Sequence, residues 1–222
     1  LNVAERTRGV IASGRFTTNG PDKDHMAALA GDARKGSGSL QLKQAPAGWT
    51  VGDEVVVTGT RFRWSNSRDD LLLENEVRRI TAIDGTTVTL DSPLIHDHVR
   101  ADPSFSIFVS NLTRPIVIRS ATARPLTERG HVMFMQGAQV DIRDAAFIDL
   151  GRTDKAAATS AANIKGVYSV HFHQNGYDQE QLFSNSVIRG TPGWGLANHS
   201  SNVVASNNVV HDFAGAAFSA EA

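Results

Sequence analysis

Residues 167–173 alternate strictly along the chain, reading Val-Tyr-Ser-Val-His-Phe-His. Successive side chains of a β-strand point to opposite faces, so this alternation predicts a strand buried on one face only. The side chains expected to point inward are Tyr168, Val170 and Phe172. Those expected to point outward are Ser169, His171 and His173. Two imidazoles about 7 Å apart on one face can share a metal ion or divide acid and base roles on one substrate. An exposed strand that carries two histidines without a function fits the same pattern.

The first half of the chain shows short strand patterns separated by turn residues. Strands are expected at residues 40–42, 54–57, 76–83 and 86–90. The last two flank Asp84-Gly85, a strong signal for a two-residue hairpin. We therefore expect residues 1–110 to form a β-rich N-terminal segment with hairpins. Residues 64–70 are expected to be a polar loop, in which Asp69 and Asp70 could bind a cation.

From residue 111 the pattern changes, because short apolar segments recur between Asn, Asp, Ser and Gly. These segments are 116–118, 140–142, 147–148, 187–188, 203–204 and 209–210. The motif at 185–188 returns at 207–210, an offset of about 22 residues that suits the coils of a β-solenoid. An earlier copy at 145–148 lies about 40 residues upstream, which is one coil plus an insertion supplied by residues 153–165. Residues 111–222 are thus predicted to form a single-stranded parallel β-helix, with a β-sandwich as the alternative.

Stacked coils place residues one period apart directly above one another, about 4.8 Å apart. His199 follows His173, and Glu221 follows His199, each at a separation that matches the length of one coil. The candidate catalytic column on one outer face is therefore His171, His173, His199 and Glu221. A second column, assigned to substrate binding, follows the apolar positions Ile148, Ile188 and Val210 and contains Asp149, Arg189 and His211. A solvated polar face without function is the alternative for both columns.

The composition excludes several classes of partner and chemistry. The 22 basic and 23 acidic residues nearly cancel, so the chain has no electrostatic footprint for nucleic acid or an anionic membrane. No apolar run is long enough to cross a bilayer. The absence of cysteine excludes disulfides and thiol chemistry. The 19 glycines and short Val/Ile runs favour an all-β protein.

The stretch 168–173 resembles the Tyr-Pro-Val-His-Phe-His motif of the family of the cell-surface transmembrane hyaluronidase and the cell-migration-inducing hyaluronan-binding protein, to which fibrocystin-like proteins are more distantly related. Other segments are similar to family segments in the same order: residues 48–57, 111–118, the surroundings of His199, and 212–221. Ser169 replaces the family proline, Asn198 and Ser200 flank His199 differently, and the cysteines of animal members are absent. These departures suggest a bacterial member.

The resemblance implies a right-handed parallel β-helix, an extracellular or cell-surface setting and the handling of glycosaminoglycans. It also places Asp212 beside the second column. Because family members have a glycine-marked β-domain upstream and further coils downstream, and because the chain begins with Leu1, we expect a fragment of a longer protein. Its last coil would then end as an open sheet edge that self-associates or binds the remaining coils.

Three functions remain open. The first is a polysaccharide-depolymerising enzyme in which Glu221 tunes the histidines as acid and base, by hydrolysis or by β-elimination from a uronic acid. The second is a carbohydrate-binding or adhesion module, and the third is a structural solenoid of a surface protein or filament. The cofactor is open; a divalent metal such as calcium is one candidate, with His171 and His173 as ligands. His96 and His98 also have metal-compatible spacing, but a solvated turn is expected there.

Overall fold

The computed structural model describes residues 8–61, 74–121 and 126–221, so the predicted loop at 64–70 with Asp69 and Asp70 lies outside the described residues. The chain divides into two compact units, Asp22–Thr113 and Leu1–Pro21 with Arg114–Ala222. Within the described parts the regular structure is β-strand, apart from one short 3-10 turn at Leu126–Glu128. The all-β prediction is therefore confirmed. No helix in these parts has the length and apolar character needed to cross a membrane.

The unit formed by residues 22–113 contains a six-stranded antiparallel sheet in the order β3-β8-β5-β6-β7-β4. Its strands are β3 (Met26–Ala28), β4 (Ser39–Gln41), β5 (Glu54–Val57), β6 (Glu76–Asp84), β7 (Thr87–Leu90) and β8 (Phe108–Asn111). The predicted hairpin forms between β6 and β7, and its last pair is Asp84 with Thr87. The two-residue loop is thus Gly85-Thr86, one position later than predicted, with Gly85 at a φ of 55°.

Asp53, in the segment 48–57 that resembles the hyaluronidase family, is a buried structural anchor. Its carboxylate accepts hydrogen bonds from Lys23 Nζ at 2.6 Å, Asn111 Nδ2 at 2.9 Å and the Thr50 amide at 3.0 Å. Burial raises the pKa of this carboxyl, but the donors together hold it below its usual range. The Gly-Asp pair of this motif therefore organises the antiparallel unit.

His98 does not lie in a solvated turn, as the sequence suggested, but is completely buried. One ring nitrogen, Nδ1, lies 2.8 Å from the Thr58 carbonyl oxygen, and Nε2 lies 3.0 Å from Glu76 Oε1. Both partners are acceptors, so a ring nitrogen that carries a proton donates to the oxygen beside it. Glu76 also accepts the amides of Ile95 and His96, each at 2.8 Å. The His98 ring thus has a structural role beside Glu76, to which His96 contributes its backbone amide.

The Glu76 carboxylate makes the antiparallel unit sensitive to acid. Burial raises the pKa of Glu76, but hydrogen bonds from the Ile95 amide, His98 and the His96 amide hold it below the ordinary value of 4.5. The folded state then binds this proton more weakly than the unfolded chain, so its contribution is complete above pH 4.5 and is lost as the pH falls through the lowered pKa. We expect hydrogen exchange of the β5 amides to accelerate in that range, and less steeply in Glu76→Gln. Equal pH profiles for the two proteins would contradict this role.

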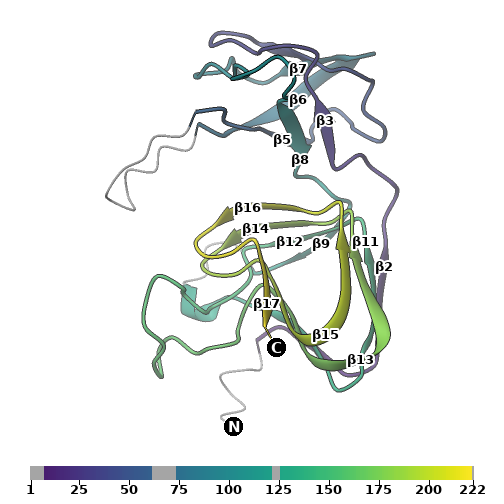
Figure 1. Ribbon diagram of the computed structural model, residues 1–222, viewed down its shortest axis with the longest axis vertical. Coiled ribbons are helices and arrows are strands. Elements are labelled where there is room, and N and C mark those ends of the chain that lie inside the picture. Colours follow the sequence, from purple (N-terminus) through teal and green to yellow (C-terminus); the bar gives the residue numbers. More distant parts are fainter. Residues whose placement is uncertain (1–7, 62–73, 122–125, 222) are drawn as a thin grey trace. The chain divides into compact units, whose positions relative to one another are not determined.

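The second unit consists of parallel strands that stack on one another (Figure 1). They are β1 (Val10–Ala12), β2 (Arg15–Asn19), β9 (Ile116–Arg119), β10 (Val132–Met135), β11 (Gln139–Arg143), β12 (Ala145–Ile148), β13 (Val170–Ser184), β14 (Val187–Thr191), β15 (Leu196–Ser206), β16 (Val209–Phe213) and β17 (Phe218–Glu221). Each apolar segment predicted after residue 111 lies in one of these strands. The sequence grouped residues 1–20 with the N-terminal segment, but β1 pairs with β10 and β2 with β11.

The stack has three faces. The long strands β13 and β15 contribute their first residues to one face and their last residues to a second, and a separate sheet forms the third. The first face contains β1, β10, the start of β13, the start of β15, and β17. The second contains β2, β11 and the ends of β13 and β15, and the third is a separate sheet in the order β9-β12-β14-β16. This parallel stacking rules out the antiparallel pairing of a sandwich for this unit.

The core of this unit is a ladder of aromatic and branched side chains. Phe172 and Val170 have no exposed surface and Leu196 is also buried, as predicted. The ring of Phe134 lies between Phe16, at 5.1 Å, and Phe172, at 5.0 Å. Two predicted core residues differ: Val210 is partly buried, and Phe218 is 48% exposed although it is opposite Leu196. Phe218 is exposed because no described strand pairs with the other side of β17.

The polar residues between the strands occupy left-handed bends. Three sets of successive bend residues have positive φ: Gln136, Gln174 and Ser200; Asp144, Asn185 and Asn207; Asp149, Gly190 and Asp212. Short polar side chains and glycine adopt this conformation at low cost. The recurrence of Asn, Asp and Gly in the sequence is therefore a requirement of the bends.

The exposed side of the last coil should make the 222-residue chain self-associate. Apolar side chains are exposed on three of its strands: Val204 of β15 at 38%, Phe213 of β16 at 41% and Phe218 of β17 at 48%. Both β16 and β17 are paired on one side only among the described strands. Open strand edges with apolar side chains favour pairing with another chain. Sedimentation should show concentration-dependent association, weakened by Phe218→Lys. A monomer over a wide concentration range would contradict the prediction.

Candidate functional site

The first predicted column lies on the first face of the parallel unit. His173 of β13 is opposite His199 of β15, and His199 is opposite Glu221 of β17. His171 is two residues before His173 on the same strand and is opposite Ala197. The one-coil separations that the sequence showed thus correspond to direct cross-strand neighbours.

Three imidazoles converge at this place, namely His171, His173 and His199, which we call the His cluster. One potential ligand atom of each residue lies within 4.8 Å of those of the other two. The Nδ1 atoms of His173 and His199 are 3.2 Å apart. Two nitrogens that bind one tetrahedral ion with bonds of about 2.0–2.1 Å are separated by about 3.3 Å. The cluster therefore has a spacing that suits a shared metal ion, and equally permits a hydrogen bond between two neutral rings.

His171 is held in the form that binds metals. Its Nδ1–H donates to the Gly166 carbonyl oxygen at 2.9 Å, which leaves the lone pair of Nε2 available. Burial lowers the pKa of His171 to about 4, so the ring is neutral at neutral pH. A backbone carbonyl that fixes the tautomer of a histidine is a typical second partner of a metal ligand.

The outer face at His171 is covered, which the alternation of the sequence did not predict. His171 is only 4% exposed, because residues 151–167, which we call the insert, fold over it and supply Gly166. Within the insert, Thr153 Oγ1 donates to the Ile164 carbonyl at 2.6 Å and accepts the Val167 amide at 2.9 Å. The stretch that sequence analysis treated as an interruption between coils is thus an ordered wall of the site.

Tyr168 was predicted to point inward with Val170 and Phe172, and this prediction is wrong. The regular strand begins only at Val170, so the alternation does not extend to Tyr168. Its ring stacks on Trp194 at 4.7 Å and meets the His171 ring edge-on at 5.2 Å, outside the apolar core. The hydroxyl is buried and has no hydrogen-bond partner among the described residues. Burial raises the pKa of Tyr168, the Glu221 carboxylate raises it further, and the nearby Gly166 backbone opposes the rise without reversing it.

The second predicted column is changed by a shift of one residue. Arg189 is opposite Ile148 and His211, whereas the sequence aligned it with Asp149. Ala146 pairs with Val187, so the offset between β12 and β14 is one residue longer than the sequence predicted. Phe147 is therefore the residue in register with Ile188, since a slip of one residue exchanges the two faces of a strand.

Asp149 directly follows β12, and Asp212 lies within β16. Both have a positive φ, so the left-handed bends account for an aspartate at these positions without a ligand. Burial lowers the pKa of His211, Asp212 raises it, and Arg189 lowers it. These residues belong to the β9-β12-β14-β16 sheet, whereas the His cluster lies on the other parallel sheet. The structure thus does not unite the two columns in one cluster.

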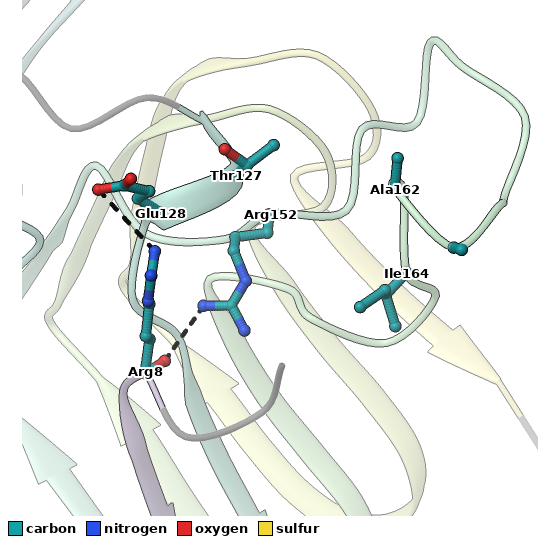
Figure 2. A pocket seen from close by; sticks show the side chains of 7 residues that line it. Arg8, Thr127, Glu128, Arg152, Ala162 and Ile164 are labelled. Atoms are coloured by element: carbon teal, nitrogen blue, oxygen red, sulfur yellow. Dashed lines mark hydrogen bonds and ion pairs between the residues drawn. The ribbon is translucent and has the colours of Figure 1, made fainter. Parts of the chain in front are cut away.

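A pocket of about 350 Å³ is lined in part by residues of the insert (Figure 2). It is lined by Arg8, Thr127, Glu128, Arg152, Ala161, Ala162 and Ile164. The Arg8 guanidinium lies 3.9 Å from Glu128, and Arg152 donates to the backbone carbonyl of Arg8 at 3.3 Å. Burial and the Arg8 charge lower the pKa of Arg152. Sequence analysis had not identified this pocket, because its residues come from segments far apart in the chain.

Comparison with known proteins shows a weak sequence relationship over most of the chain. No family model matches. The chain is 29% identical over 209 residues to a G8 domain-containing protein of Dictyostelium discoideum, covering 92% of this chain and 17% of that protein. A second G8 domain-containing protein of the same organism is 28% identical over 172 residues, covering 75% of this chain and 10% of that protein. The chain therefore spans less than a fifth of the length of these relatives.

Among solved structures, the likeness is to phage tailspikes. The tailspike gp61 of Pseudomonas phage phi297 has a TM-score of 0.35 and 13% identity, over 92% of this chain and 37% of that chain. The Gp54 tailspike of Acinetobacter baumannii bacteriophage AP22, solved in complex with capsular saccharide, has a TM-score of 0.33 and 12% identity, over 93% of this chain and 40% of that chain. Likeness at this level carries no argument about function. The chain is thus an all-β protein with weak similarity to G8 domain-containing proteins.

Proposed function

We propose that this chain is the polysaccharide-active part of an extracellular or cell-surface protein, and that it depolymerises a polymer containing uronic acid at the His cluster. The observation that carries the proposal is the convergence of three imidazoles within 4.8 Å on one face of a parallel stack. The resemblance of residues 168–173 to the hyaluronidase family motif supports the same substrate class. In this proposal the coils form a right-handed parallel β-helix, supported by the right hand of nearly all parallel crossovers.

The donor set of the His cluster favours a zinc-class ion over the calcium considered from the sequence. Calcium takes oxygen ligands, whereas imidazole nitrogens suit zinc and its neighbours. The neutral ring of His171, with its second nitrogen bonded to Gly166, fits this role. When bound, such an ion supplies Lewis acidity that polarises an oxygen of the ligand.

Glu221 is assigned the proton transfer. Two observations support this role: Glu221 is opposite His199 in register, and its charge raises the pKa of Tyr168, which contacts His171. Glu221 would accept a proton either from an attacking water, in hydrolysis, or from the carbon next to a uronic carboxylate, in β-elimination. In both cases the glycosidic C–O bond breaks and the leaving oxygen takes up a proton, which solvent water can supply. A glycosidase with two carboxylates would need a second acid across the scissile bond, and the described strands place only Glu221 in this column.

Product formation from acidic polysaccharides tests the proposal. The 222-residue chain should release soluble fragments from at least one uronic-acid polymer, stop when a chelator is added, and recover with zinc. Absorbance of an unsaturated product distinguishes β-elimination from hydrolysis, which yields only new reducing ends. The matched control is His96→Ala, in the antiparallel unit, which should leave turnover unchanged. Binding of polymer without product would support a carbohydrate-binding module instead, and neither binding nor product would support a structural role.

A further inference from the structure

We propose that the Tyr168 hydroxyl is a fourth polar group of the site and donates a hydrogen bond to a carboxylate oxygen of the ligand held at the His cluster. This inference rests on the proposed metal site, and it extends the site to a residue that the sequence assigned to the core. The ligand must then present an anionic oxygen beside His171.

The Tyr168 hydroxyl is buried, and its proton has no acceptor among the described residues. Tyr168 is 2% exposed. The Gly166 backbone amide lies close enough to the hydroxyl oxygen to lower its pKa by hydrogen bonding, but an amide can only donate, so the O–H proton has no acceptor among the described residues. More than about nine in ten buried polar atoms in native proteins have a partner, and exceptions often mark functional sites. The ring meets His171 edge-on at 5.2 Å, so this unpaired donor belongs to a residue in contact with the cluster.

The ring is fixed by contacts that have no need of the hydroxyl. It stacks on Trp194 at 4.7 Å, and the Lys155 ammonium group lies 3.9 Å from the centre of the Trp194 ring. Stacking and cation–π contacts of this kind hold aromatic rings in one orientation. Lys155 belongs to the insert, so the same segment that fixes His171 also fixes the Trp194–Tyr168 pair. The donor is therefore preorganised before a ligand arrives.

Protonation favours donation. A tyrosine hydroxyl, whose ordinary pKa is about 10, keeps its proton at neutral pH. A neutral donor that faces an anionic oxygen makes a charge-assisted hydrogen bond. Loss of such a bond weakens binding by about 10- to 100-fold.

The test uses cobalt(II) as a coloured substitute for zinc in the 222-residue chain, with acetate and glucuronate as probes. Titration of each anion is followed through the visible absorption of the ion. Tyr168→Phe should bind cobalt as the wild type does but bind both anions about 10-fold or more weakly. The matched control is Tyr177→Phe, which removes a hydroxyl from a residue of β13 that is 65% exposed and should change nothing.

Thermal unfolding of the metal-free chain separates this role from a structural one. Replacing a buried hydroxyl that lacks a partner with hydrogen should leave the Tm unchanged or raise it. A lower Tm for Tyr168→Phe would show a structural hydroxyl and overturn the inference. Unchanged anion affinity with cobalt bound would overturn the inference and leave the metal site standing. Failure of the wild type to bind cobalt would overturn the metal site, and the inference with it.

Discussion

Replacing His199 with alanine should weaken zinc binding by about 100-fold, the upper end of the loss seen for partners of a metal ligand, and lower turnover at limiting zinc in the same proportion. The reason is geometric: His199 provides one of the three converging nitrogens, and its Nδ1 lies 3.2 Å from that of His173. Isothermal titration with zinc and the polymer assay measure the two effects independently. Because His199 is only partly buried, the unfolding free energy of the metal-free chain should change by less than about 1 kcal/mol.

A second histidine variant, His171→Ala, is not a clean test of metal binding, because it also changes stability. The sequence placed His171 on an open face, where its loss would leave stability nearly unchanged, but its ring is 4% exposed and bonded to Gly166. His171→Ala would remove a buried ring and its hydrogen bond to the Gly166 carbonyl, at a cost of about 1–3 kcal/mol. A suitable control is Glu180→Gln on the exposed bend of β13. Zinc affinity that survives in His199→Ala would exclude a site built on the three histidines.

Phe172→Ala should destabilise the parallel unit by about 3–5 kcal/mol. The Phe172 ring has no exposed surface and lies 5.0 Å from that of Phe134, which in turn contacts Phe16. Its removal leaves a cavity between stacked coils, because strands on either side are held by their own pairing and cannot close over it. Urea denaturation with an unchanged m-value measures the loss.

Phe218→Ala provides the matched comparison for this core prediction. The two phenylalanines belong to the inward side of the same face, but Phe218 is 48% exposed. At a protein concentration low enough for the chain to be monomeric, its truncation should cost about 1 kcal/mol, in proportion to the smaller apolar area removed from water. Equal losses for Phe172→Ala and Phe218→Ala would mean that another chain covers the last coil in solution.

The sequence was sufficient to predict which residues of the His cluster lie opposite one another, but not which segments surround the cluster. Alternation at 170–173 identified Phe172 as core and His173 as outward, since side chains of a regular strand alternate strictly. The one-coil separations placed His199 and Glu221 correctly, because parallel coils repeat at the length of one turn of chain. The second column failed because the longer connection through the insert changed the offset by one residue.

By itself, the sequence determined that the chain is all-β, where most strands run, and which residues follow one another along the histidine column. Period and alternation are local properties, so they are legible without coordinates. Only the tertiary structure decided that the insert covers His171, that Tyr168 turns out of the core toward Trp194, and that His98 is a buried partner of Glu76. These depend on contacts between segments far apart in the chain, whose approach is set by packing and hydrogen bonding that no local pattern encodes.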